Sequence, residues 1–372
     1  MAATHSDFFK TERTASEIKS EFLPRVFEIF VSGLLLNPSG QPTMPVPCMV
    51  LAGLDAHQPA PAAVQWLQQV YRSSNTRLDL NQGTQTVLYD ADKSVLADLK
   101  EHLVNLSFYQ ELKHLPVVLQ DEADETLILE LLKKGSPSVS FLNPFSGSFS
   151  QQILLRALKD GHSDLFMLFS LEEMKAALKK TKAGSLLQEF FGDRFSQIKE
   201  FQKKTREANR IEEFLLNSLE SVLIDKCYYT FRFRVNRPDK KQTSYYLVFA
   251  SKDGQAYTKL KELILAYSDF QEDGVPLFGA NLMQQQTSLF HEHYKYSIAN
   301  LVQDLSQKAH EFNNKALQQI YEKHNIGTLY TFENYKVAFE KLMRMGKVRF
   351  INPKTGQPIS KLTQASLVRY SS

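Results

Sequence analysis

Short apolar runs alternate with amphipathic helical segments between residues 48 and 170, and this alternation most limits the folds open to the chain. The runs are continuously apolar, which is typical of parallel strands covered by helices on both faces. The expected strands are 48–54, 85–90, 115–120, 138–143 and 163–170. The sequence therefore predicts an α/β fold with a doubly wound, mostly parallel sheet.

Two aromatic-rich runs follow a mostly helical, charged insertion at about 172–220. They span 227–235 and 244–251, alternate in polarity and are separated by a polar segment with Asn, Pro and Asp. This pattern predicts an antiparallel hairpin, which we expect near one edge of the sheet that contains strand 139–142. Five strand–helix units closed by a hairpin resemble the Rossmann-like strand inventory of class I methyltransferases.

The predicted organisation has three parts: a helical lead-in and linker over 1–47, the α/β domain over 48–283, and a helical arm with a C-terminal module over 284–372. In the lead-in, Pro24 is expected to kink or break the helix. In the module, a helix ends at Gly346 and a turn then separates two short extended runs. This order resembles a winged-helix module.

Several classes of protein do not fit the composition. The two cysteines, Cys48 and Cys227, lie far apart and form neither a metal-ligand pattern nor a disulfide framework. His291 and His293 would point to different faces of a helix, so no metal site is expected. The first twenty residues lack the pattern of a signal peptide, and the most apolar stretch contains Glu28. We therefore expect a cytoplasmic protein.

The fourth expected strand ends on Asn143, Pro144 and Phe145. Ligands of doubly wound sheets lie outside the carboxyl ends of the strands, so these three residues are candidate catalytic residues. The tripeptide resembles the motif that ends strand four in amino-methyltransferases. The amide oxygen would accept a hydrogen bond from a substrate amine, and the aromatic ring would stack on a flat substrate ring. Alternatively, Asn143 caps a helix or begins a turn, and Pro144 is ordinary loop punctuation.

Over roughly residues 8 to 260, the chain resembles the three-Cys-motif partner proteins, a bacterial group with a methyltransferase-like core. The resemblance rests on "SEIK" ahead of a helix in 8–30, on "FLNPFSG" where the family has Asp-Pro-Phe-Gly, on "EFFGD" (189–193) and on "YYLVFASKDG" (245–254). It implies S-adenosylmethionine as cofactor, and a neighbouring protein with a three-cysteine motif as partner.

The expected cofactor-binding residues follow the first three strands: Ala52, Gly53, Asp55, Asp90 and Asp121. The family's first loop carries an upstream acid and two glycines. This chain lacks that acid and has Asp55 at the second glycine, where a side chain would block the pocket or move the acid. Asp90 would bind ribose hydroxyls, or is a helix N-terminal acid. Asp121 would reach the adenine amine, or is a capping acid.

The basic residues are concentrated in the C-terminal module. The net charge of the chain is +3, whereas residues 324–372 hold eight basic and two acidic side chains, a net charge of +6 that leaves −3 elsewhere. The candidate nucleic-acid-binding residues are Lys336, Arg344, Lys347, Arg349 and Lys354. Alternatively, the charges are a solvated face and the module only packs or dimerises.

Two hypotheses for function follow. The first is an S-adenosylmethionine-dependent methyltransferase that acts on or with nucleic acid. The second is a catalytically lapsed protein of this fold that serves as a nucleic-acid- or protein-binding scaffold. Asp90 and the Asn143–Phe145 motif favour the enzyme, whereas the altered first loop favours the scaffold.

Overall fold

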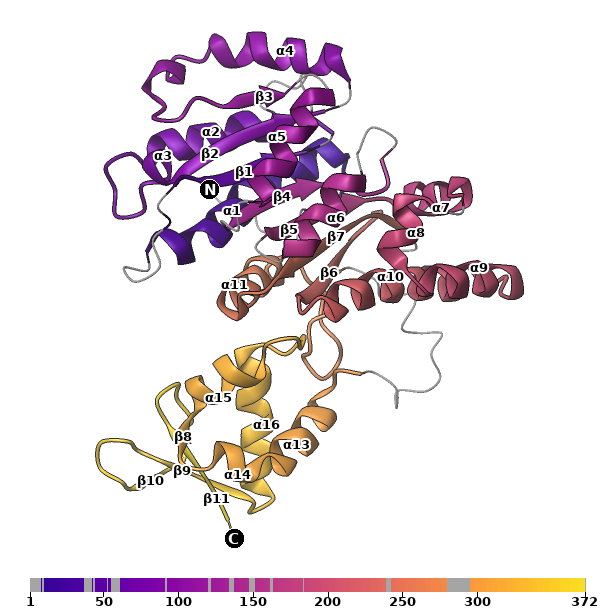
Figure 1. The fold of residues 1–372 in the computed structure, drawn as a ribbon. Helices are drawn as coiled ribbons and strands as arrows, with labels where there is room; N and C mark the ends of the chain where they lie inside the picture. Colours follow the sequence, from indigo (N-terminus) through magenta and orange to yellow (C-terminus); the bar gives the residue numbers. More distant parts are fainter. Residues whose placement is uncertain are drawn as a thin grey trace. The chain divides into compact units, whose positions relative to one another are not determined.

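The computed structural model forms two compact units, each described here by itself (Figure 1). The larger unit lies within residues 11–237 and 242–260, and the smaller one is made mainly of residues 261–372. The predicted boundaries at residues 47 and 283 stay predictions. The described residues are 8, 10–36, 42, 44–51, 53–54, 61–90, 92–119, 122–133, 137–146, 151–160, 163–182, 184–238, 242–279 and 295–371.

A seven-stranded sheet forms the centre of the larger unit, in the order β3-β2-β1-β4-β5-β7-β6. Strands β1 to β5 run parallel, and the order reverses between β1 and β4. This confirms the prediction of a doubly wound, methyltransferase-like α/β fold. The strands are β1 (Val46–Val50), β2 (Thr84–Tyr89), β3 (Val117–Leu119), β4 (Ser138–Leu142), β5 (Ser163–Phe169), β6 (Tyr229–Asn236) and β7 (Thr243–Ser251).

The aromatic-rich runs form the antiparallel hairpin β6–β7 in this same sheet, as the sequence predicted. Strand β7 pairs antiparallel with β5 as well, so β7 lies between β5 and β6. Two ring stacks hold this region, Phe166 on Phe249 with centroids 5.1 Å apart and Phe231 on Phe249 at 4.8 Å. Aromatic cross-strand pairs of this kind stabilise neighbouring strands.

Helices cover both faces of the sheet, as expected for buried parallel strands. On one face Leu142, Met167 and Val248 share a core with residues of α5, α6 and α10. On the other face Phe27 of α1 packs edge-on against Trp66 of α2, whose indole donates to Thr86 of β2. The helices are α1 (Ala15–Leu35), α2 (Ala62–Arg72), α3 (Leu80–Gly83), α4 (Lys93–Val104), η2 (Tyr109–Glu111), α5 (Glu122–Lys133), α6 (Gln151–Asp160), α7 (Leu171–Lys180), α8 (Leu186–Phe191), α9 (Arg194–Lys204), α10 (Ala208–Asp225) and α11 (Gly254–Leu265).

The first helix runs unbroken through Pro24, so the predicted break into two helical pieces is wrong. A proline inside a helix costs about 3 kcal/mol through its missing N–H. Burial of Phe22, Val26 and Phe30 on the same helix, each at most 4% exposed, offsets this cost. Thr14 and Glu17 form a capping box that fixes where the helix begins.

Helices and a small sheet build the smaller unit, which Figure 1 draws from orange to yellow. The sheet has the order β10-β9-β11-β8, with antiparallel pairing throughout. The core joins Leu301, Phe339 and Val368 from two helices and a strand. The elements are α13 (Ile298–Gln307), α14 (Ala309–Phe312), β8 (Lys315–Ala316), α15 (Leu317–His324), α16 (Phe332–Arg344), β9 (Val348–Ile351), β10 (Pro358–Ile359) and β11 (Leu367–Tyr370).

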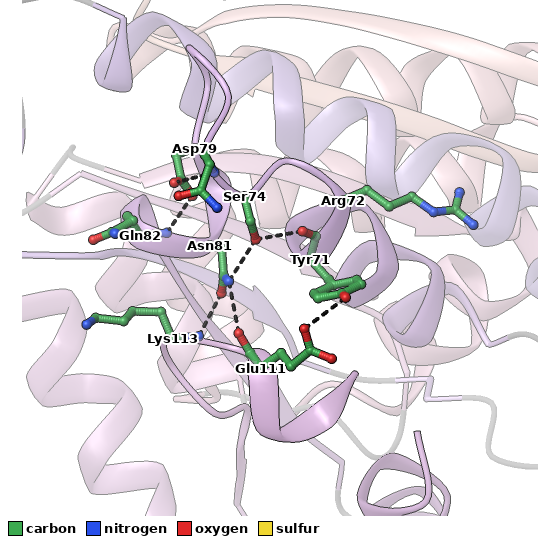
Figure 2. Close-up of a pocket in the computed structure, with 9 residues that line it drawn as sticks. Tyr71, Arg72, Ser74, Asp79, Asn81, Gln82, Glu111 and Lys113 are labelled. Atoms are coloured by element: carbon green, nitrogen blue, oxygen red, sulfur yellow. Dashed lines mark hydrogen bonds between the residues drawn. The ribbon is translucent and has the colours of Figure 1, made fainter. Parts of the chain in front are cut away.

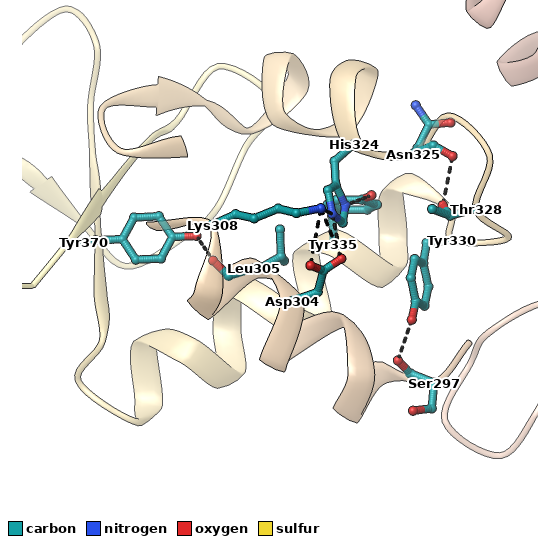
Figure 3. Close-up of polar contacts among 10 residues, drawn as sticks. All are labelled: Ser297, Asp304, Leu305, Lys308, His324, Asn325, Thr328, Tyr330, Tyr335 and Tyr370. Atoms are coloured by element: carbon teal, nitrogen blue, oxygen red, sulfur yellow. Dashed lines mark hydrogen bonds and ion pairs between the residues drawn. The ribbon is translucent and has the colours of Figure 1, made fainter. Parts of the chain in front are cut away.

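A polar network inside the smaller unit ties α13, α15 and α16 together (Figure 3). His324 lies 2.6 Å from the hydroxyl of Tyr335 through Nδ1, and 2.8 Å from Asp304 through Nε2. Lys308 lies 2.9 Å from the same Nε2 atom. Burial, and then the ammonium of Lys308, lower the pKa of His324, whereas Asp304 raises it.

A buried lysine donates hydrogen bonds to the loop between α15 and α16. Lys261 of α11 is 1% exposed, and its ammonium donates to the carbonyls of Asn325, Thr328 and Tyr330 at 3.3, 2.9 and 2.9 Å. Burial lowers the pKa of Lys261 to about 7, and the charge of Glu262 opposes that shift. Three carbonyls of one loop therefore share a single donor group.

Candidate functional site

The ends of three neighbouring parallel strands bring predicted site residues to one edge of the sheet. Gly53 follows β1, Asp90 follows β2 and Asn143 follows β4. Because β2, β1 and β4 are adjacent and parallel, their carboxyl ends meet at the reversal of strand order. Doubly wound proteins bind ligands in this position. The candidate site of this chain is therefore the edge formed by these three residues.

Two contacts close the connection that follows β1. The ammonium of Lys19, on α1, donates to the carbonyl of Gly53, and the backbone N–H of Leu54 donates to Oδ2 of Asp90 at 3.1 Å. The other carboxylate oxygen of Asp90 accepts from the N–H of Asp92 at 3.1 Å. Asp90 is 5% exposed and Lys19 is 4% exposed. Asp90 therefore joins two strand ends, while Asp92 caps α4.

Gly53 adopts φ +64, which favours glycine at this position. A Cβ atom added there would lie 3.6 Å from the Lys19 nitrogen, which is an ordinary contact. The requirement for glycine is therefore conformational. The backbone angle at Gly53 favours glycine, although the surrounding space would accept a small side chain.

The described residues beside Gly53 line a small cavity. Lys19, Leu23, Gly53, Leu54 and Leu99 help to line a cavity of about 10 Å³. That volume holds about one water molecule, whereas ligand pockets have volumes of about 300–1,000 Å³. This cavity is therefore far too small to hold S-adenosylmethionine. Residues 52 and 55–60, which belong to the same connection, lie outside the described residues.

Asn143 is engaged in a turn. Its Oδ1 accepts from the N–H of Phe145 at 3.1 Å, and its Nδ2 donates to Oε1 of Glu173 at 3.1 Å. The N–H of Ser146 donates to the Asn143 carbonyl at 3.3 Å. The alternative in which Asn143 begins a turn describes these bonds, and the catalytic role stays a prediction.

Pro144 and Phe145 are buried rather than presented to a ligand. Phe145 is 5% exposed and packs edge-on against Phe169, with ring centroids 4.9 Å apart. To stack on a substrate, the ring of Phe145 would have to leave the core. The expected stacking role of Phe145 therefore requires a different conformation from this one.

Sequence reasoning missed two residues of the same edge. Glu173 belongs to the capping box of α7, because its Oε2 accepts from the backbone N–H of Ser170 at 2.7 Å, and its other oxygen binds Asn143. The "SLEE" start of that helix is the signal for such a box. Lys19 lies four residues before Leu23 in the apolar stripe of α1, an unusual place for a charge.

Tyr245, on β7, adds a phenol near this carboxylate. Burial raises the pKa of Tyr245, and the charge of Glu173 raises it further, whereas a hydrogen bond with the backbone of Ala15 lowers it. The edge thus holds a carboxylate, an amide and a neutral phenol. Such groups can accept and donate hydrogen bonds to a polar ligand.

Three of the predicted cofactor residues, Ala52, Asp55 and Asp121, lie outside the described residues. Their roles stay predictions, as does the choice between a blocked pocket and a relocated acid at Asp55.

A larger cleft lies at the opposite edge of the sheet, beside the amino end of β2 (Figure 2). Its volume is about 490 Å³, and Tyr71, Asn81 and Glu111 are among the residues that line it. Its polar groups bind one another: Tyr71 donates to Glu111 at 2.9 Å, and the Asn81 amide donates to Ser74 and accepts from the Lys113 N–H. The cleft is therefore built by internal hydrogen bonds and lies away from the strand ends that usually bind ligands.

The predicted nucleic-acid-binding residues all lie in the smaller unit. Lys336 and Arg344 are on α16, Lys347 directly precedes β9, Arg349 is on β9, and Lys354 is in the turn that follows. Lys336 forms an ion pair with Glu333 at 2.7 Å and lies over the ring of Phe332, 5.3 Å from its centroid. The other four are exposed.

Comparisons with known proteins assign neither a family nor an activity to the chain. No family model and no curated protein matches the chain. Among solved structures, the methyltransferase domain of bacterial CtHen1-C is similar at 10% identity and a TM-score of 0.33, over 63% of this chain and all of that domain. A similarity this low does not assign an activity. The assignment of the fold therefore rests on the strand order of the sheet.

No described helix is long and apolar enough to cross a membrane. Within the same part of the chain, no group of three or more His, Cys, Asp or Glu side chains is arranged to hold a metal ion.

Proposed function

We propose that this chain is a methyltransferase-fold scaffold that binds nucleic acid and does not itself transfer a methyl group. The observation that carries the proposal is the contact of Lys19 with Gly53, beside a cavity of about 10 Å³. The hydrogen bond between Leu54 and Asp90 attaches the residues that follow β1 to the end of β2. Both hydrogen bonds lie at the carboxyl ends of strands, where doubly wound proteins bind ligands, and we infer that they leave little room for the expected cofactor.

The nucleic-acid part of the proposal rests on the smaller unit. We assign it as a winged-helix module, because α13, β8, α15 and α16 are followed by the antiparallel strands β9, β10 and β11. Its last 49 residues, from His324 onward, carry the net charge of +6. Basic side chains on such a module suit the phosphate backbone of nucleic acid. A neighbouring protein with a three-cysteine motif is the protein partner that the family resemblance adds.

Calorimetric titration of the intact chain with S-adenosylmethionine and with S-adenosylhomocysteine tests the scaffold. We expect no heat of binding from either compound. Saturable binding with one site per chain would refute the proposal.

Binding to nucleic acid needs its own test, a mobility-shift titration of the intact chain with duplex DNA and duplex RNA. The expected affinity falls linearly in a plot of log Kobs against log salt, because the contacts are with phosphates. A chain that binds neither duplex at low salt is not a nucleic-acid scaffold.

A second function, S-adenosylmethionine-dependent methyl transfer, is favoured by one observation: Asp90 and Asn143 lie at the carboxyl ends of strands on either side of β1. Under this alternative Asn143→Ala loses turnover and keeps cofactor affinity. Asp90→Ala instead weakens cofactor binding by about 1–3 kcal/mol, the value of a charge-assisted hydrogen-bond pair. The same behaviour in both variants would contradict these roles.

A further inference from the structure

Residues 346–371 contain five basic side chains and no Asp or Glu. All five are exposed, and they are Lys347, Arg349, Lys354, Lys361 and Arg369. We call residues 346–371 the basic strand segment, because they include β9, β10 and β11. A stretch of this length with one sign of charge sets up a positive potential that attracts polyanions.

Two of these residues face each other. In the antiparallel pair β9–β11, Arg349 is directly opposite Arg369, and the next pair along the strands is Val368 with Phe350. Val368 and Phe350 are at most 1% exposed and face the core, whereas both arginines are exposed. The arginines therefore share the outer face of the small sheet. Like charges directly opposite on two strands destabilise the pair, so this arrangement lacks a structural advantage.

Within the described ranges, no carboxylate pairs with this face. Among the ion pairs of the described residues, none involves the five basic side chains of this segment. Arg369 donates through Nε to Oδ1 of Asn314 at 2.9 Å, which fixes the plane of its guanidinium group. The remaining N–H groups of an arginine held this way can bind two oxygens of one phosphate.

The helix α16 differs in this respect. Its outward side carries Lys341 and Arg344, but also Glu333 and Glu340, and Glu333 already pairs with Lys336. Winged-helix modules that read DNA through a helix would use this side. In this chain the helix has nearly balanced charge and the basic strand segment does not.

We propose that the outer face of β9 and β11 binds the phosphate backbone of nucleic acid through the Arg349–Arg369 pair, with Lys347, Lys354 and Lys361 extending the contact. This inference rests on the nucleic-acid part of the proposed function and names the surface that performs it. An extended polyanion fits these five cations, of which Arg349 and Arg369 lie on β9 and β11 and the other three lie before or between the strands. A lipid surface fits less well, because Val348, Phe350 and Ile351 are buried and cannot insert.

The experiment compares two double variants that each remove two positive charges. Arg349→Gln with Arg369→Gln changes the strand pair, and Lys341→Gln with Arg344→Gln is the matched control on α16. Binding to duplex DNA is measured in intact chains over a salt series. The strand variant should lower the slope of log Kobs against log salt by about 1.8, which corresponds to two phosphate contacts at about 0.9 each. The control should change the slope by less than half of that amount.

Thermal unfolding of the same proteins separates binding from folding. The strand variant should melt close to the temperature of the unaltered chain, because it removes both a like-charge pair and the exposed hydrogen bond from Arg369 to Asn314. Equal slopes for the two double variants, or a larger effect of the control, would overturn the inference and leave nucleic-acid binding intact. If the unaltered chain binds neither duplex, the result contradicts the nucleic-acid part of the proposed function, and the inference about the strand face falls with it. Binding to vesicles of phosphatidylcholine and phosphatidylserine without binding to either duplex would assign the face to lipid instead.

Discussion

The ammonium of Lys19 donates to the carbonyl of Gly53, so that the first helix of the chain closes the end of the first strand. Both groups lie at the edge where doubly wound sheets bind ligands. A buried lysine of α1 is thus part of the candidate site.

Lys19→Ala tests how much this contact stabilises the larger unit. The variant leaves the Gly53 carbonyl without this donor and removes a buried stem, so we expect a loss of about 2–4 kcal/mol in the free energy of unfolding. Lys179→Ala, at an exposed position of α7, should change it by less than about 0.5 kcal/mol. Urea unfolding of both variants gives the comparison, and equal midpoints would show that the contact contributes little.

Asn143→Ala and Asn143→Asp separate the two hydrogen bonds of the Asn143 amide. The alanine variant loses both and should unfold about 1–2 kcal/mol more easily. The aspartate variant keeps the acceptor for Phe145 but sets a second carboxylate against Glu173. Its stability relative to the unaltered chain should therefore recover as the pH falls and one carboxyl takes a proton. A deficit for Asn143→Asp that is independent of pH would contradict the Glu173 contact.

Lys261 gives the smaller unit a dependence on pH. Burial lowers its pKa from the usual 10.5 to about 7 in the folded chain, so between these two values the unfolded chain binds more protons. Stability should therefore rise with pH across this window, by at most about 1.4 kcal/mol per pH unit. Lys261→Met removes the rise and leaves three carbonyls without this donor, whereas Lys259→Met, at an exposed position of the same helix, keeps it. Denaturant unfolding near pH 7 and pH 9 checks the difference, and parallel curves for Lys261→Met and the unaltered chain would disprove it.

Tyr335→Phe removes the hydroxyl that lies 2.6 Å from His324. Tyr335 is fully buried, so the ring should stay in place while Nδ1 of His324 loses its partner. We expect a loss of about 1–3 kcal/mol in the free energy of unfolding. Tyr296→Phe is the matched control, because the hydroxyl of Tyr296 donates to Gly327 at an exposed position. Unfolding followed by tyrosine fluorescence measures both, and similar losses would argue against the buried network.

The sheet could be predicted because burial on both faces leaves a direct trace in the sequence. Runs such as residues 138–142 are apolar or small throughout, and β6 alternates because it carries arginines between aromatic and apolar residues. The positions of Asp90 and Asn143 at strand ends followed from the same pattern. Apolar runs and alternating polarity can be predicted because each depends only on residues that are adjacent in the sequence.

The contacts of the site depend on residues that are distant in sequence, and this is why they were not predicted. Lys19 is buried only because α1 lies beside the end of β1, 34 residues later. Phe145 follows a proline and resembles an exposed aromatic, but Phe169 on the neighbouring strand draws it into the core. The partner of Arg349 on the next strand, Arg369, depends on strand register, which local composition does not reveal.

The place of β7 between β5 and β6 decides where the larger unit can be shortened. A chain that ends after β5 would leave that strand as an open edge, with Leu165, Met167 and Phe169 losing the partners that β7 supplies. Open, apolar edges of this kind recruit other chains into aggregates. Expression of the α/β unit alone should therefore extend past Ser251, and a tag or an inserted domain is tolerated better in the exposed helical insertion around α9 than in the hairpin.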